Sequence, residues 1–418
     1  MPDAPPPLAF ASTARLPADG DNVAIATRRL EAGTLVSADG GELRLSHTVL
    51  EGHRFVVEPI GAGGDLVSWG LPFGTARRDI APGEYACNER ILKALAGRDV
   101  DFELPAGPNF DDRLERFAFD PAGFSPGRQV KRVDQPGTFL GYRRPGRRGV
   151  GTRNHVLVLA ATSRANGFAS AVARRFEHVA GEHADIDGVV AVTHTEGATE
   201  SEPHNLEYVL RALSGFIVHP NVGAVLVVDY PGAGYGIDEL REYALGHDYA
   251  LDDVPHRFMS IERAFGTELE TAESIIRGWL PEVGAMARSE EPLSALRIAL
   301  QCGGSDAFSG VSGNALAGWV AKRLIRHGGS AVIAETDELM GAEAYVLQNV
   351  RDLETARRLL ERIEAFKAYV GNHGASAEGN PTGGNNYRGL YNIAIKSLGA
   401  ARKFDPEVRL DHVLRYAE

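Results

Sequence analysis

The chain has few cysteines and no long apolar run. Cys87 and Cys302 are the only 2 cysteines in 418 residues and are not spaced as CxxC, which argues against a disulfide scaffold or zinc knuckle and favours the reducing cytoplasm. The N-terminus, MPDAPPPLAF, has no basic region followed by an apolar core, and no run reaches about 18 apolar residues. We therefore expect neither secretion nor membrane insertion.

Basic residues are outnumbered by acidic ones, 44 against 56. The net charge of -12 disfavours a nucleic-acid surface, because phosphate contacts need clustered cations. The exception is the segment from Arg143 to Arg153, which is rich in arginine. It is interpreted either as an RNA-binding arm or, more commonly for such a run, as a solvated linker.

The hydrophobic content of 44% allows more than one core. Short β-branched and aromatic stretches between Gly and Asp predict a small N-terminal β domain, and a proline-rich stretch after it predicts an extended linker. Cutting near Pro108 should leave two folded pieces. The predicted segments are a flexible N-terminus (1–20), a β domain (21–95), a linker (96–140), an α/β domain (141–290) and a second α/β region (291–418).

The body of the chain alternates continuous apolar strands with amphipathic segments. Examples are HVLVLAATS, then GFASAVARRFEHVA, then DGVVAVTHT. Uninterrupted apolar strands are typical of a parallel sheet covered on both faces. The predicted fold class is therefore α/β, with a small N-terminal β domain, for which the resemblance described below implies a β-clip-like fold, followed by Rossmann-like parallel-sheet units.

The most informative motif is QCGGSDAFSG, Gln301 to Gly310, between an apolar run and a helix-like run. A buried strand that ends in a glycine-rich turn at a helix start is a frequent geometry of α/β active sites. Glycines let the backbone approach a ligand, and the N–H groups there favour an anion. The alternative is a well-capped turn in which Asp306 is the N-cap.

Two other strand ends carry groups suited to catalysis. THTEGATE contains His194 and Glu196, which could form a base with its orienting carboxylate or two metal ligands. A surface hydrogen bond is the commoner reading of such a pair. In AETDE, Glu335 ends a predicted strand, and Asp337 with Glu338 fall in or near the first turn of the next helix. These acidic residues are either part of the site or a solvated acidic helix start favoured by the helix dipole.

CGGSDAFSG resembles the corresponding segment of the altronate and galactarate dehydratase family, hydro-lyases that act on sugar acids. Further segments are similar in the same order: DNVAIATRRLEAGTLV and the GHR turn of the family's SAF domain, GYRRPGRRGVGTRNHVLVLAATS, HPNVGAVLVV, AETDELMGAE and GNPTGG with KSLGA. The resemblance implies dehydration of an aldonate or aldarate to a 2-keto-3-deoxy acid. It also adds a third interpretation of the arginine segment, in which Arg153 binds a substrate carboxylate.

Such a dehydration needs a base, an acid, and cations that stabilise an enediolate. We expect the chosen side chains to line one cleft, with His194 and Asp306 on the same side of the sheet. The predicted residues are His194, Asp306 and Glu335 for catalysis; Arg153, Asn154, Gly303, Gly304, Ser305 and Ser309 for substrate; and Glu196 and Cys302 for metal.

The sequence also departs from the family pattern. Cysteines that relatives carry after the first strands of the main domain are missing, so we do not expect an iron–sulfur cluster. We expect a divalent metal ion (Mg, Mn, Ca or Fe) as the cofactor. Ile395 stands ahead of KSLG, where relatives usually carry an acidic residue, and Tyr85 to Glu89 stand where the small domain of many relatives carries a histidine. Relatives continue beyond LDHVLRYAE, so we expect a shortened form or a missing final segment.

Two other functions remain open: a sulfo-lyase acting on a small hydroxy acid, and a non-catalytic paralogue that binds sugar acids. The expected partner is a small sugar acid, with no nucleic acid and no membrane. A homo-oligomeric state is left open.

Overall fold

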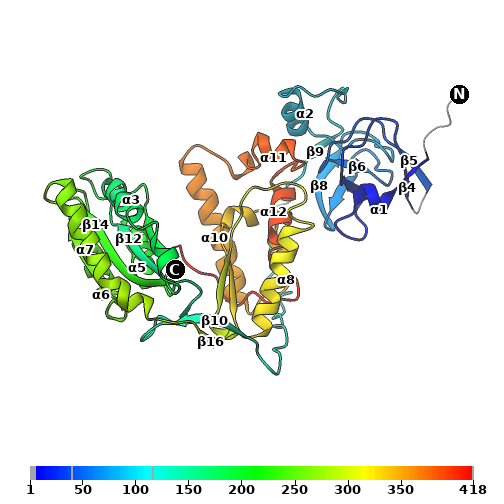
Figure 1. Cartoon of the computed structure of the whole chain (residues 1–418). Helices are drawn as coiled ribbons and strands as arrows, with labels where there is room; N and C mark the ends of the chain where they lie inside the picture. Colours follow the sequence, from blue (N-terminus) through cyan, green and yellow to red (C-terminus); the bar gives the residue numbers. More distant parts are fainter. Residues whose placement is uncertain (1–5, 39–40, 115–116, 417–418) are drawn as a thin grey trace. The chain divides into compact units, whose positions relative to one another are not determined.

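The structure, a computed structural model, describes residues 6–38, 41–114 and 117–416. It divides into two compact units (Figure 1). Unit 1 consists of Met1–Arg132, Arg297–Arg326 and Ser330–Val413, and unit 2 of Val133–Leu296, His327–Gly329 and Leu414–Glu418. Among the described residues, no helix is both long and apolar enough to cross a membrane.

The N-terminal part of unit 1 is built from short strands, as the sequence predicted. They form three small sheets, ordered β1-β4-β5, β2-β3-β6 and β7-β8-β9. The helix α2 (Glu89–Ala96) lies between β8 and β9 in the chain, and Asn88 caps it by accepting a hydrogen bond from the Ile91 N–H. The strands are β1 (Leu8–Ala9), β2 (Ala14–Arg15), β3 (Val23–Ala26), β4 (Leu35–Ala38), β5 (Gly41–Arg44), β6 (Arg54–Val56), β7 (Asp65–Ser68), β8 (Leu71–Ala76) and β9 (Phe110–Asp112).

The first residues are more ordered than the sequence suggested. Residues 1–5 lie outside the described part, but β1 pairs in parallel with β4, and β2 pairs antiparallel with β3 on either side of α1 (Phe10–Thr13). Residues 8–15 of the segment predicted to be flexible (1–20) therefore lie in regular secondary structure, with β1 and β2 each forming the edge strand of a sheet.

The core of the β region is shared with the C-terminal part of the chain. Leu390, Tyr391, Ala394 and Ile395 belong to the same buried cluster as the strands β3, β6 and β8. The phenol of Tyr391 accepts from the Arg54 N–H and donates to the Ala86 carbonyl, each at 2.9 Å. A cut near Pro108 would remove these residues from the core, so the predicted separability is contradicted.

The C-terminal part of unit 1 forms a second, smaller α/β element. Strands β17 (Arg297–Leu300) and β18 (Ser330–Ile333) pair in parallel, Arg297 with Ser330, and α8 (Gly313–Arg326) connects them. Figure 1 shows α8 beside α12. The remaining elements are η4 (Thr336–Leu339), α9 (Glu343–Val346), α10 (Leu353–Asn372), η5 (Ala377–Gly379), α11 (Gly383–Tyr387) and α12 (Ile393–Ala401).

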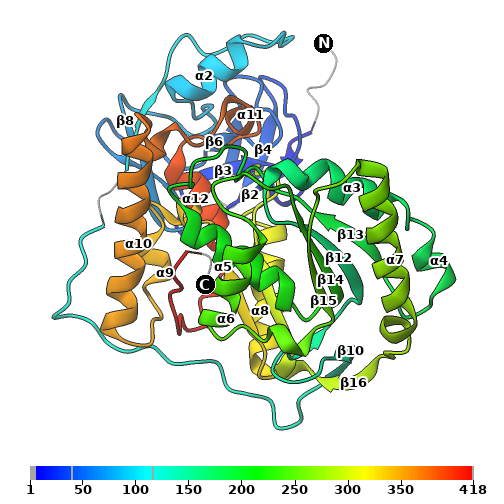
Figure 2. The same ribbon diagram turned by 90° about the vertical axis from the view of Figure 1, so that its left-hand side faces the viewer.

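Unit 2 contains the longer parallel sheet, ordered β13-β12-β14-β15. Figure 2 shows α3 and α7 on one face and α5 and α6 on the other, and a separate apolar cluster fills each face. This mixed α/β content with parallel strands agrees with the predicted class. The main elements are β12 (His155–Ala160), α3 (Asn166–Arg174), α4 (Val179–Glu182), β13 (Gly188–Val192), α5 (Leu206–Val218), β14 (Val222–Asp229), α6 (Ile237–Gly246), β15 (His256–Ser260) and α7 (Phe265–Gly284).

Unit 2 also contains a three-stranded sheet ordered β11-β10-β16. Its strands β10 (Thr138–Arg143) and β11 (Val150–Gly151) come before β12 in the chain, and β16 (Ser289–Pro292) comes after α7. Here the arginine-rich segment has a structural role. Arg144 and Arg148 are buried and donate to backbone carbonyls, among them those of Pro220 and His219. Burial lowers the pKa of both guanidinium groups to about 10, so they remain charged at neutral pH. The RNA-binding and solvated-linker interpretations are therefore both wrong for these two arginines.

Candidate active site

The strongest cluster of reactive groups lies where β17 and β18 end. The loop after β17 begins with Gln301 and Cys302, and Ala334 and Glu335 follow β18. Because the two strands are parallel neighbours, these residues emerge at one edge of the sheet. The Glu335 carboxylate accepts from the Cys302 N–H at 3.0 Å and from the Gln301 amide at 3.3 Å. The predicted neighbourhood of Cys302 and Glu335 is present.

Glu335 is held in an unusual backbone conformation. Its φ is 70°, in the left-handed region, which costs a residue other than glycine free energy and persists only where surrounding contacts enforce it. The hydrogen bond to the Cys302 N–H is such a contact. Strained residues of this kind gather at functional sites, which makes Glu335 a strong candidate for chemistry.

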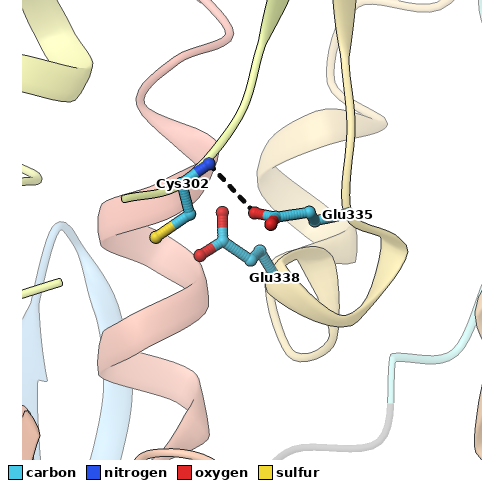
Figure 3. Close-up of side chains that lie close together, drawn as sticks. All are labelled: Cys302, Glu335 and Glu338. Atoms are coloured by element: carbon cyan, nitrogen blue, oxygen red, sulfur yellow. Dashed lines mark hydrogen bonds between the residues drawn. The ribbon is translucent and has the colours of Figure 1, made fainter. Parts of the chain in front are cut away.

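Glu338 completes the cluster. Ligand atoms of Cys302, Glu335 and Glu338 all lie within 4.8 Å of one another (Figure 3). Glu335 precedes the 3-10 helix η4 and Glu338 is three residues later, and side chains three apart in a 3-10 helix lie on the same side. The three-residue spacing between Glu335 and Glu338 is visible in the sequence and could have indicated this proximity. Glu338 is nevertheless not among the site residues predicted from the sequence.

A buried lysine balances part of this charge. The Lys403 Nζ lies 2.7 Å from the Glu338 Oε2, and the two side chains are only 4% and 3% exposed. Lys403 follows α12, so no local pattern linked it to Glu338. Two carboxylates beside one ammonium leave the cluster with a net negative charge, which suits a cation.

The thiol of Cys302 lies 2.9 Å from the Ser305 hydroxyl. Burial raises the pKa of this thiol, and the Glu338 carboxylate raises it further. The thiol therefore keeps its proton at neutral pH unless a cation displaces it. A thiolate and two carboxylates are suitable donors for a divalent metal, so the cluster fits one; the metal pair predicted from sequence, Glu196 with Cys302, instead spans two units.

The glycine-rich turn presents open backbone next to the cluster. Gly303 and Gly304 are exposed, and a Cβ at either would meet nothing within 4 Å. Asp306, in contrast, is used by its own turn: its Oδ1 accepts from the N–H groups of Phe308 and Ser309, each at 2.9 Å. It caps this turn rather than α8, which begins only at Gly313. The alternative of a capped turn therefore describes Asp306 and Ser309, but Asp306 is not the N-cap of α8.

In unit 2, His194 follows β13 and is engaged by backbone on both sides of its ring. Its Nε2 lies 3.0 Å from the Ala160 carbonyl, and its Nδ1 accepts from the Glu196 N–H at 3.2 Å. This arrangement places the proton on Nε2. The ring would have to release the Glu196 N–H before Nδ1 could act as a base, so these contacts organise the loop.

Arg153 and Asn154 lie at the other end of this sheet. They precede β12, whereas His194 follows β13, and β12 and β13 run parallel. The expectation that Arg153 and His194 line one cleft is therefore wrong. Asn154 is fully buried and donates to the carbonyls of Asp185 and Val283.

The structure thus brings together Cys302, Ser305 and Glu335 from the predicted set and adds Glu338 and Lys403. His194 and Asp306 belong to different units, so their proximity remains a prediction.

Sequence models of three domains match this chain, which agrees with the resemblance noted above. They are the altronate/galactarate dehydratase SAF domain (residues 16–93), the second domain of D-galactarate dehydratase/altronate hydrolase (141–284) and the D-galactarate/altronate dehydratase C-terminal domain (293–418).

Curated relatives agree with these matches. The chain is 31% identical to altronate dehydratase of Escherichia coli over 95% of this chain and 75% of the relative, and 30% identical to altronate dehydratase of Bacillus subtilis over 95% and 74%. It is also 31% identical to the (2R)-sulfolactate sulfo-lyase subunit beta of Chromohalobacter salexigens, over 67% and 68%. The three domain matches in family order and the near-complete alignments lead to one conclusion: this chain belongs to the altronate/galactarate dehydratase family.

Proposed function

We propose that this protein is a hydro-lyase that converts a sugar acid, an aldonate or aldarate, to a 2-keto-3-deoxy acid. The observation that carries the proposal is the cluster of Cys302, Glu335 and Glu338 beside the open glycine turn. The alignments with dehydratases extend over 95% of the chain, against 67% for the sulfo-lyase subunit. This difference in coverage favours loss of water over loss of sulfite.

The proposed cofactor is a divalent metal ion, held by Cys302 and Glu338. Lys403 orients the Glu338 carboxylate through their 2.7 Å ion pair. When bound, the ion supplies a Lewis acid that polarises the substrate carboxylate and the departing hydroxyl.

Glu335 is the proposed base. Among the described residues, the Gln301 amide alone donates to its Oε1, at 3.3 Å, whereas Glu338 is buried against Lys403. Glu335 takes the proton from the carbon next to the carboxylate, and the hydroxyl leaves the neighbouring carbon. That proton and the hydroxide make up the water released, and the enol tautomerises to the keto acid. Gly303, Gly304 and Ser305 are proposed to hold the substrate with backbone N–H and hydroxyl groups.

The remaining assignments stay predictions. For His194 and Glu196, which lie in unit 2, the proposed acid–base or metal role stays a prediction. Asp306 and Ser309 support the proposed substrate turn through their mutual hydrogen bonds. The positions of Arg153 and Asn154 give no support to a role in binding substrate.

A substrate panel tests the function. Purified protein supplied with a divalent cation is expected to release keto acid from altronate, galactarate or a related sugar acid, measured by trapping the keto group. Sulfolactate with detection of sulfite is the parallel assay. Tight binding without turnover of any sugar acid would favour the non-catalytic alternative, and sulfite release would favour the sulfo-lyase.

Metal removal is expected to abolish turnover reversibly. Chelation should remove activity, and an ion of the predicted set Mg²⁺, Mn²⁺, Ca²⁺ and Fe²⁺ should restore it; with one thiolate and one carboxylate as proposed ligands, Mn²⁺ and Fe²⁺ should restore it best. Metal content measured by mass spectrometry should fall in Cys302→Ala and stay unchanged in Cys87→Ala, whose thiol is buried in the β core. Visible absorption of an iron–sulfur cluster in anaerobically purified protein would contradict this prediction.

A further inference from the structure

Unit 1 contains a cavity of about 530 Å³ whose lining does not include Cys302, Glu335 or Glu338. Its lining includes residues of the N-terminal β region, among them Arg15, Glu51 and Trp69. Residues after the glycine turn, from Phe308 to Ala315, and Arg402 also line it. The volume is in the range of small-molecule sites.

Two arginines at this cavity lack acidic partners. Arg15 donates to the backbone carbonyls of Ala11 and Ala14, and Arg402 donates to the Tyr345 hydroxyl at 3.1 Å. Neither forms an ion pair with any carboxylate in the described residues. A guanidinium group pairs well with a carboxylate through two parallel hydrogen bonds. Two such groups at one cavity therefore favour an anion, and a dianion most.

Trp69 forms a rigid apolar wall of the same cavity. Its φ is 53°, in the left-handed region, and Asp21 holds it there by accepting from the N–H groups of Trp69 and Gly70 at 2.9 and 2.8 Å. A Cβ at Gly310 would lie 2.7 Å from the indole, so only glycine allows this close packing. An indole face suits the C–H groups of an extended sugar chain.

The remaining polar groups suit hydroxyls. Thr27 and Ser312 provide hydroxyl groups, and the exposed Glu51 provides an acceptor. Glu51 also reduces the positive charge, so the cavity has a small net positive charge in place of the strong one that a polyphosphate would need.

The cavity and the metal-binding cluster share two segments of chain. The glycine turn runs from Cys302 at the cluster to Phe308 at the cavity, and Arg402 at the cavity is adjacent in sequence to Lys403 at the cluster. In the middle of the turn, Ala307 packs on Gly52: a Cβ there would lie 3.3 Å from the Ala307 Cβ. The cavity and the cluster are therefore lined in part by the same segments of chain.

We propose that this cavity binds a hydroxy dicarboxylate, with Arg15 and Arg402 each receiving a carboxylate and Trp69 contacting the carbon chain. The inference rests on the proposed function only in naming a sugar acid. It adds to that function a binding site for an aldarate in unit 1.

Trp69 fluorescence provides the test. In a Trp279→Phe, Trp319→Phe background treated with chelator to prevent turnover, galactarate should change the fluorescence saturably. Altronate should bind about tenfold more weakly, and galactitol should have no effect. Arg15→Gln and Arg402→Gln should each weaken galactarate binding by about 10- to 100-fold, the range for losing a charge-assisted pair. Arg323→Gln, an arginine of α8 outside the cavity lining, is the matched control.

Equal binding of galactarate and galactitol, or unchanged galactarate affinity in both arginine variants, would overturn the proposal. Circular dichroism of each variant, with Arg402→Lys as a charge-preserving substitution of intermediate affinity, separates lost binding from lost folding. A parallel rise in KM for galactarate identifies the ligand as substrate, and an unchanged KM identifies it as a separate bound acid. Saturable binding in Glu335→Gln without turnover would support the cavity even if the catalytic proposal fails.

Discussion

Replacing Glu335 by glutamine is expected to lower turnover by about two to four orders of magnitude, the usual range for removing a general base. Glutamine keeps the shape of the side chain and can still accept from the Cys302 N–H through its carbonyl oxygen, so folding should change little. It cannot take a proton from carbon. Steady-state kinetics on the best substrate of the panel, with metal content measured on the same samples, checks the expectation.

The matched control is Asp337→Asn, which removes an acidic group of the same 3-10 helix that is not part of the cluster. Its turnover should stay near that of the unmodified protein. Glu338→Gln should instead lower metal content, because it removes a proposed ligand and leaves Lys403 without its ionic partner. A wild-type rate in Glu335→Gln would remove this residue from the mechanism.

Truncating Tyr391 is expected to cause the largest loss of stability. Tyr391→Ala should lower the free energy of unfolding by about 3 to 5 kcal/mol, as for other large aromatic truncations in a core. The ring is fully buried and packs against Phe73 and Phe110 at centroid distances of 6.1 and 5.9 Å. Tyr391→Phe should cost about 1 to 3 kcal/mol, because the Arg54 N–H and Ala86 carbonyl lose their partner.

Urea unfolding followed by Trp69 fluorescence, in the background without the other tryptophans, measures these changes in unit 1. The control is Tyr369→Ala: Tyr369 is 60% exposed on α10, and such a surface change should stay within about 0.5 kcal/mol. If Tyr391→Ala costs no more than this control, the β region and the C-terminal segment do not share one core.

Much of the candidate site was predictable because it depends on local order along the chain. Apolar runs predicted β17 and β18, and Gly303 and Gly304 predicted the turn between β17 and α8. Once two strands pair in parallel, residues that follow them meet at one edge, which brought Cys302 and Glu335 together. Glu338 was within reach of the same reasoning through its three-residue spacing from Glu335.

Other expectations failed because they depended on the end of the strand at which a residue lies, or on whether its side chain is buried. Arg153 and Asn154 were grouped with His194 by family analogy, but they precede a strand and His194 follows one. Arg144 and Arg148 were read as solvated because arginine is usually exposed. In the fold they satisfy backbone carbonyls of loops far away in the sequence, which composition does not reveal.

The sequence by itself determined the family, the α/β alternation and the glycine turn with Cys302, since these rest on residue order and short-range periodicity. Only the tertiary structure decided that Lys403 neutralises Glu338, that Tyr391 belongs to the N-terminal core, and that Arg15 and Arg402 face one cavity. Contacts between residues hundreds of positions apart depend on how apolar surfaces are removed from water together, and on which polar groups must then be paired. Those requirements are set by the packed fold as a whole.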